Sequence, residues 1–186
     1  MQISEIVLKK IKEIVARKPK AKFSWLDSIY EDIQYISLDD KGDVGEEITR
    51  DILKNFNCEI EFQKGVTKAT KGWDIKSNNI KIEIKLATVT VGTGGFQHEN
   101  LHPQRGFDAI LFIDIAPNDI YLTAVKKENI IWKNLHRREN GVYKCDFSVN
   151  HLTEKSITKF KEYKTGIIKT DQDFFDIYKH LDPTFS

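Results

Sequence analysis

The sequence predicts an α/β fold in which helices flank a central mixed β-sheet. Three observations indicate this class. Apolar residues recur with helical spacing before residue 57, short strand-like segments lie between residues 58 and 88, and residues 109–116 form a continuous apolar run. Such a run is typical of a strand that is covered on both faces. Helices followed by strands and a final helix indicate a layered domain with the sheet inside.

Three helices are expected ahead of the sheet. Residues 3–16 repeat apolar side chains with helical spacing, and Pro19 follows them as a stop signal. Residues 24–36 show the same spacing and form the second expected helix. The third is expected to begin at Gly42 and Asp43, where Asp43 fits an N-cap.

The expected strands are short and lie in the middle of the chain: 58–62, 73–75, 80–88, 109–116 and 120–125. The Gly-rich and polar segment 92–106 is expected to be a loop. A short helix over residues 128–135 and an amphipathic helix over residues 171–181 complete the prediction.

The length of 186 residues favours a single domain, 1–186. Within it we expect a helical N-terminal part (1–41), a core (42–125) and a helical C-terminal part (126–186). Apolar residues make up 40% of the chain and charged residues 31%, which fits a real core under a solvated surface.

The cellular compartment is expected to be the cytoplasm. The first residues lack the pattern of a secretory signal, and no apolar run approaches the roughly 18 residues of a membrane span. Cys58 and Cys145 have neither metal-binding nor redox spacing, so we expect two reduced thiols. No association with a membrane is expected.

The charges are almost balanced but unevenly placed. The formal net charge is +1, which argues against a protein that holds DNA tightly by itself, because phosphate neutralisation supplies most non-specific affinity. Residues 9–22 carry seven basic side chains and one acidic one, whereas residues 27–51 carry nine acidic and two basic ones. A basic arm suits a phosphate backbone and an acidic middle suits a metal site, although each also fits a solvated helix face.

A hairpin over residues 72–88 gathers the chemistry. Asn78 and Asn79 separate two strand-like runs, and Asn tolerates the positive φ of a two-residue turn. With that turn, Asp74 lies opposite Glu83 on one face of the pair. Lys85, two residues after Glu83, points to the same face.

Two carboxylates and one ammonium on a single face suit phosphodiester hydrolysis. Directly opposed carboxylates repel each other, and a divalent cation removes that penalty. Magnesium is commonly held by one or two carboxylates together with waters and phosphate oxygens. A neighbouring lysine orients the attacking water or stabilises negative charge in the transition state.

The segments GWDI and IEIKLAT resemble the core of the PD-(D/E)xK nucleases, the superfamily of many restriction endonucleases. The resemblance implies a restriction-endonuclease-like core over about residues 42–125, with Trp73 where the family often has proline. It implies Mg²⁺, which Mn²⁺ can replace, held by Asp74, Glu83 and the carbonyl of Ile84. Lys85 then acts on the attacking water.

The same resemblance implies an acid on the helix ahead of the hairpin. Gly45 is followed by Glu46 and Glu47, and we favour Glu46 because it comes directly after the glycine. Both glutamates also fit an ordinary exposed position near a helix start, where negative charge is favourable.

Taken whole, the chain is similar to the small subunits of heterodimeric type IIS restriction endonucleases. This likeness implies double-stranded DNA as the substrate and cleavage of one strand. It also implies a large partner subunit that recognises the DNA site. A stand-alone repair or junction nuclease of the same fold, and a non-catalytic DNA-binding module, remain as alternatives.

A competing motif is HENLH, residues 98–102, which matches the H-E-x-x-H pattern of zinc metallopeptidases. That pattern needs a helix, and Pro103 disfavours helical backbone at His102. We therefore rank a zinc peptidase low. Gln97, His98 and Asn100 are expected to line the nuclease cleft or to contact a phosphate, if they are more than an ordinary polar loop.

Overall fold

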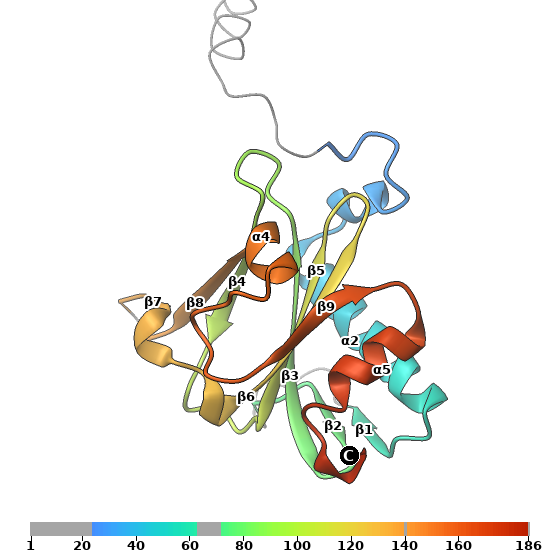
Figure 1. The fold of residues 1–186 in the computed structure, drawn as a ribbon, viewed down its shortest axis with the longest axis vertical. Coiled ribbons are helices and arrows are strands. Elements are labelled where there is room, and N and C mark those ends of the chain that lie inside the picture. Colours follow the sequence, from blue (N-terminus) through green and yellow to red (C-terminus); the bar gives the residue numbers. More distant parts are fainter. Residues whose placement is uncertain (1–23, 63–71, 140, 186) are drawn as a thin grey trace, which may run out of the picture.

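The computed structural model describes residues 24–62, 72–139 and 141–185. Within these residues the chain is built around a six-stranded sheet of order β1-β2-β3-β5-β6-β9, in which β3 and β5 run parallel and the other neighbours antiparallel (Figure 1). Its strands are β1 (Ile60–Phe62), β2 (Ile75–Ser77), β3 (Ile80–Thr88), β5 (Ala109–Ile115), β6 (Ile120–Lys126) and β9 (Lys164–Ile168). The predicted α/β class with a mixed central sheet flanked by helices is confirmed.

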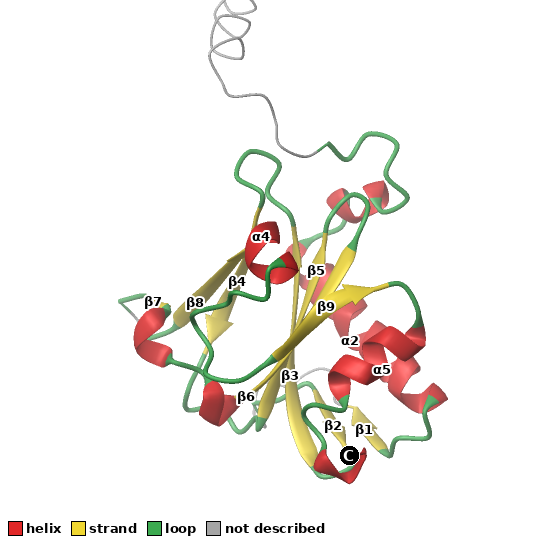
Figure 2. Cartoon of the chain, viewed as in Figure 1, coloured by secondary structure: helices red, strands yellow, loops and turns green. Residues whose placement is uncertain are grey.

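Two helices cover one face of this sheet: α2 (Leu38–Asn55) and α5 (Asp171–Tyr178), which lie side by side (Figure 2). Gly45 of α2 lies directly over Ile84 and Leu86 of β3. The rings of Phe56 and Phe175 stack with centroids 4.0 Å apart, which joins the end of α2 to α5. This helical layer therefore buries the apolar side of β3.

A second, smaller sheet covers the other face. Its order is β4-β8-β7, with β4 (Gly95–Leu101), β8 (Tyr143–Ser148) and β7 (His136–Arg137), and α4 (Val149–Thr153) follows β8. Phe112 of β5 packs against His98 of β4 and Phe147 of β8, with ring centroids 4.7 and 5.0 Å away. Buried side chains from Trp25 to Leu181 belong to one hydrophobic cluster.

The strand β4 corrects the prediction of a loop over residues 92–106. Phe96 and His98 are buried, while Gln97 between them is exposed, so the segment alternates like a half-covered strand. Asn100 has a φ of 60° at an irregularity in the pairing with β8. The glycines ahead of the strand and the polar side chains on its outer side concealed this alternation.

The expected helices near the N-terminus also need correction. Residues 24–36 contain only the short 3₁₀ helix η1 (Glu31–Gln34), because Asp27 has a φ of 63°, which interrupts a right-handed helix. The next helix, α2, begins at Leu38 and not at residues 42–43. Ser37 is its N-cap, and the Ser37 Oγ accepts a hydrogen bond from the Asp40 amide at 3.1 Å. The helix predicted over residues 3–16 lies outside the described residues.

The C-terminal part, residues 126–186, is not the helical segment that was predicted. It contributes three strands as well as α4 and α5. The helix expected over residues 128–135 is replaced by two short 3₁₀ helices, η2 (Lys127–Asn129) and η3 (Trp132–Asn134), and a third, η4 (Pro183–Phe185), follows α5. Strand β9 carries Gly166, with low strand propensity, so it escaped a prediction based on local pattern.

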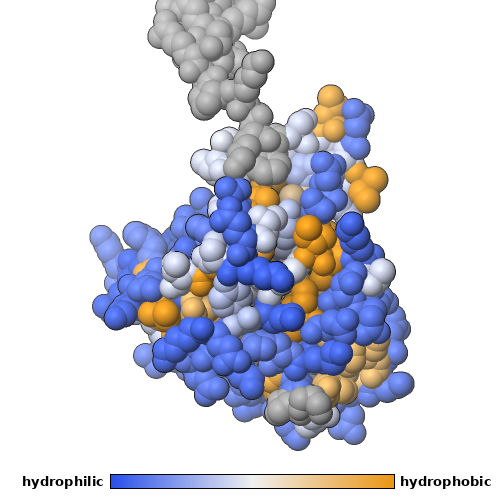
Figure 3. Space-filling model, in the orientation of Figure 1, coloured by the Kyte–Doolittle hydropathy of each residue, from blue (hydrophilic) through white to orange (hydrophobic). Residues whose placement is uncertain are grey.

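The surface is largely hydrophilic in the view of Figure 3, with a few exposed apolar side chains. The most exposed large ones lie near η1 and the start of α2: Leu26, Ile29, Tyr35 and Leu38. None of the helices in the described part of the chain is both long and apolar enough to cross a membrane.

The close packing of α2 on β3 leads to a stability prediction. A Cβ at Gly45 would lie 3.2 Å from the Leu86 Cβ and 3.3 Å from the Ile84 Cγ2, whereas a Cβ at Gly42 meets nothing within 4 Å. Alanine gains helix propensity at both positions, but only Gly45→Ala crowds the sheet. We expect Gly45→Ala to be about 1–3 kcal/mol less stable than Gly42→Ala in urea unfolding. Equal stabilities would contradict the close approach.

Candidate active site

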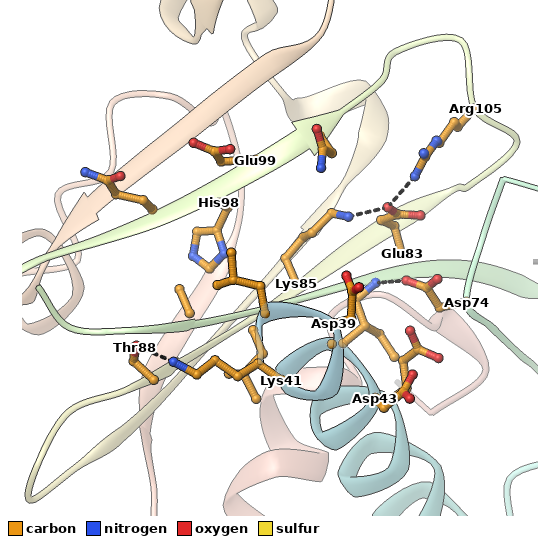
Figure 4. Close-up of a pocket in the computed structure, with 18 residues that line it drawn as sticks. Asp39, Lys41, Asp43, Asp74, Glu83, Lys85, Thr88, His98, Glu99 and Arg105 are labelled. Atoms are coloured by element: carbon orange, nitrogen blue, oxygen red, sulfur yellow. Dashed lines mark hydrogen bonds and ion pairs between the residues drawn. The ribbon is translucent and has the colours of Figure 1, made fainter. Parts of the chain in front are cut away.

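A cleft of about 680 Å³ opens where α2 and β4 approach the same stretch of β3 (Figure 4). The pairing of β2 with β3 ends at Ile75 and Ile82, yet β3 continues to Thr88. Beyond Ile82, β3 therefore has no strand partner on that side among the described residues. The cleft lies along this open edge.

Asp74 is placed at the point where the pairing ends. The hairpin register is the predicted one, because Ser77 pairs with Ile80 and Ile75 with Ile82. Asp74 itself lies one residue ahead of β2, where the prediction had it inside the strand. It is buried, and its Oδ2 accepts a hydrogen bond from the Ile84 amide at 2.7 Å.

The Ile84 carbonyl faces the same side as Asp74. The N–H and C=O groups of one strand residue point to the same side of the strand. Since the Ile84 N–H points to Asp74, its carbonyl also points to the open edge. The two carboxylates and this carbonyl thus come from neighbouring positions, and their role as metal ligands stays a prediction.

Glu83 lies at the centre of the site and is only 2% exposed. Its Oε1 receives Lys85 Nζ at 2.6 Å and Arg105 Nη1 at 3.0 Å. Its Oε2 is buried and has no hydrogen-bond partner among the described residues. A buried carboxylate oxygen without a partner costs free energy unless a ligand satisfies it. This oxygen is therefore available to a cation.

Arg105 was not found by sequence reasoning. It lies 22 positions after Glu83 and reaches the site from the turn His102–Arg105, in which the Arg105 amide donates to the His102 carbonyl at 3.1 Å. Pro103 occupies the second position of this turn, which it favours. The turn was visible in the sequence as a proline signal, but its position over Glu83 depends on the tertiary fold. Burial lowers the pKa of His102, and the charge of Arg105 lowers it further.

Helix α2 presents acidic side chains to the cleft. Glu46 is buried and lines it, whereas Glu47 is exposed and lies 4.0 Å from Arg50 in an ion pair. Asp39 and Asp43 also line the cleft, one helical turn apart on the same side of α2. Sequence reasoning placed Asp39 only in the acidic run over residues 27–51, and it took Asp43 for a helix N-cap, not for a residue of the site.

The cleft is lined by more acids than bases. The acids are Asp39, Asp43, Glu46, Asp74, Glu83 and Glu99, and the bases are Lys41, Lys85 and Arg105. An excess of carboxylates in a hollow favours cations and disfavours phosphate groups. The local electrostatics of the cleft thus favour binding of a cation.

The donor set fits magnesium better than zinc. Across the described part of the chain, no group of three or more His, Cys, Asp or Glu side chains is arranged to hold a metal ion. Mg²⁺ does not need such a cage, because it keeps several waters and is held by one or two carboxylates and phosphate oxygens. The oxygens of Asp74, Glu83 and Ile84 are donors of the type that such partial coordination uses.

The HENLH motif does not form the helical histidine pair of a zinc peptidase. It lies on β4, where His98 is buried between Phe112 and Phe147. The His98 Nε2 contacts the Asp114 Oδ1 at 2.8 Å, although the ring N–H is not aligned for a hydrogen bond. Burial raises the pKa of Asp114, and His98 opposes that shift. Gln97, His98 and Asn100 do line the cleft, as expected.

No protein family and no curated protein matches the sequence of this chain. Among solved structures, a bacterial homing endonuclease, I-Ssp6803I, is similar, with a TM-score of 0.44 and 11% sequence identity. The similarity covers 78% of this chain and 96% of the homing endonuclease. This similarity is too distant to indicate the function of the chain.

The buried pair beneath the cleft leads to a second stability prediction. Removing one member of a buried pair leaves the other without compensation, so His98→Leu is expected to cost about 3–5 kcal/mol. Adding Asp114→Leu removes the stranded carboxyl, so the double variant should be at least about 1 kcal/mol more stable than His98→Leu alone. Chemical unfolding of the four proteins of this cycle measures both values, and simple additivity would exclude the coupling.

Proposed function

We propose that this chain is a magnesium-dependent endodeoxyribonuclease of the PD-(D/E)xK type that cuts one strand of double-stranded DNA. In this proposal residues 1–186 act as one nuclease domain. The observation that carries it is the meeting of Asp74, Glu83 and Lys85 at the open edge of β3, where Glu83 Oε2 is buried and has no partner in the part of the chain that the structure describes. Two carboxylates with a free buried oxygen and an adjacent ammonium match the needs of phosphodiester hydrolysis.

Asp74, Glu83 and the Ile84 carbonyl would hold the cation, and Mn²⁺ is expected to replace Mg²⁺. Such a cation supplies Lewis-acid polarisation of a phosphoryl oxygen and a lower pKa of a bound water. Glu46 extends the acidic wall of the site from α2 and would support it through water.

Lys85 would position the attacking water or stabilise the negative charge that develops at phosphorus. Its Nζ lies 2.6 Å from Glu83 Oε1, so the ammonium is held beside the proposed ligand oxygens. The water oxygen forms a bond to phosphorus as the bond from phosphorus to the 3′ oxygen breaks. The products are a 5′-phosphate and a 3′-hydroxyl group.

The balance of charge supports a role as one subunit of a larger enzyme. The net charge is +1, and the cleft has more acids than bases, so the chain offers little to hold duplex DNA unaided. One site of this kind cuts one strand, and a double-strand break needs a second site. The proposal is therefore the small subunit of a heterodimeric type IIS restriction enzyme, with a large subunit that recognises the DNA sequence.

Nicking of supercoiled plasmid tests the site. At low salt with Mg²⁺ or Mn²⁺, Asp74→Ala is expected to lose at least about 10²-fold in cleavage rate, the order found when one group that stabilises a transition state is removed. Wild type and variant are each assayed alone and mixed with the protein encoded beside this chain in its genome.

The possible results separate the hypotheses. Cleavage that disappears in Asp74→Ala and needs the neighbouring protein supports the subunit role. Cleavage by the chain alone favours a stand-alone repair or junction nuclease. If wild type never cuts, the nuclease proposal is wrong and a non-catalytic DNA-binding module becomes the better hypothesis. If Asp74→Ala cuts as well as wild type, the assignment of the site to Asp74 is wrong.

The choice between Glu46 and Glu47 is tested by a matched pair of variants. Glu46 is buried in the cleft wall, while Glu47 is exposed beside Arg50. Glu46→Gln is expected to lower the nicking rate by roughly tenfold or more, because second partners of metal ligands commonly carry that much. Glu47→Gln should cut like wild type. If Glu47→Gln lowered the nicking rate and Glu46→Gln did not, the supporting acid would be Glu47, on the outer side of α2.

A further inference from the structure

Two positively charged side chains contact the same carboxylate oxygen of Glu83. Lys85 Nζ and Arg105 Nη1 both lie within 3.0 Å of Glu83 Oε1, and Figure 4 shows Lys85 reaching it from β3 and Arg105 from a loop. One ammonium is enough to neutralise one carboxylate. The charge of Glu83 therefore does not explain why Arg105 is also present.

The backbone at Arg105 is held firmly at the rim of the cleft. The turn that begins at His102 sets its position, and its carbonyl accepts a hydrogen bond from Lys127 Nζ at 2.6 Å. A Cβ at Gly72, which has a φ of 71°, would lie 3.1 Å from the Arg105 Cβ. This support fixes where the side chain starts, while the side chain itself is 40% exposed.

We infer that Arg105 is a phosphate-binding residue, which Glu83 holds in place until a divalent cation takes that carboxylate. The inference rests on the proposed function and extends it to a residue outside the PD-(D/E)xK pattern. A cation on Glu83 would be close to the Arg105 guanidinium, and like charges at such distances repel strongly in a buried site. The guanidinium then needs another anion, and the phosphodiester backbone provides one.

Arg105 is better suited than Lys85 to exchange partners. The Lys85 side chain is 18% exposed, less than half the value for Arg105, and its contact with Glu83 Oε1 is shorter. The planar guanidinium also presents parallel donors that match two oxygens of a phosphate. The same cation binding would thus prepare the hydrolytic site and release a residue that grips the substrate.

The metal-binding arm of the test needs no nuclease activity. Wild type, Arg105→Ala and Arg105→Lys are titrated with Mn²⁺ by calorimetry in the absence of DNA. Arg105→Ala removes a competitor for Glu83, so the affinity for Mn²⁺ should rise by roughly three- to tenfold. Arg105→Lys keeps the positive charge and should stay near wild type. A merely structural role for Arg105 predicts weaker or unchanged binding of Mn²⁺ in Arg105→Ala.

The DNA-binding arm measures the salt dependence of binding to a short duplex in Ca²⁺. Loss of one phosphate contact should reduce the slope of log K against log salt by about 0.9 in Arg105→Ala. Arg50→Ala is the matched control, because it removes the same charge from an ion pair with Asp51 that does not line the cleft. Arg105→Gln replaces Arg105→Ala if the latter does not fold by circular dichroism.

The results of the two arms are read together with plasmid nicking. Tighter Mn²⁺ binding and a smaller salt slope than Arg50→Ala support the inference. An unchanged Mn²⁺ affinity, or a slope equal to that of Arg50→Ala, overturns it even if wild type nicks DNA. If both shifts occur while wild type never nicks, the phosphate site stands and the nuclease proposal fails.

Discussion

The whole candidate site depends on the hydrogen bond between the Asp74 carboxylate and the Ile84 amide. Asp74 lies just ahead of β2, which begins at Ile75. Its side chain accepts the hydrogen bond that a backbone carbonyl would accept in a longer hairpin. The exchange satisfies the exposed edge of β3, turns the Ile84 carbonyl outward and holds Asp74 beside Glu83. If β2 continued to pair with β3, backbone groups would cover this edge, and the Ile84 amide would not be available to the Asp74 carboxylate.

The local charges at Glu83 show that this place is not optimised for stability alone. A buried oxygen without a partner costs about 1–3 kcal/mol, and Glu83 Oε2 has none within residues 24–62, 72–139 and 141–185, while Lys85 and Arg105 both contact Oε1. A purely structural carboxylate would distribute its donors over both oxygens. The uneven arrangement is consistent with the proposal that the Glu83 Oε2 binds a cation.

The part of the site that the sequence predicted is the part encoded locally. Asn78 and Asn79 set the hairpin register, and that register alone brings Asp74 near Glu83 and Lys85. Arg105 was missed, because its contact with Glu83 depends on the path of β4. The start of α2 was missed because Ser37 and Asp40 form a capping box ahead of Gly42 and Asp43, which looked like a helix start. Strand β4 was missed because glycines and polar side chains hide its alternation.

The acidic side chains of α2, together with the ion pairs of Lys85 and Arg105, determine the charge that a substrate would meet in the cleft. Without a bound cation the cleft carries more negative than positive charge, and two of its three bases are engaged by Glu83. In the proposed function, a phosphate backbone would then meet repulsion at the open edge of β3. A cation bound there would reverse the local sign of the charge and, by our inference, release Arg105 from Glu83 in the same step. Under the proposed function, affinity for DNA at the cleft and readiness for hydrolysis would thus become one equilibrium, and the remaining affinity would have to come from surfaces outside the cleft.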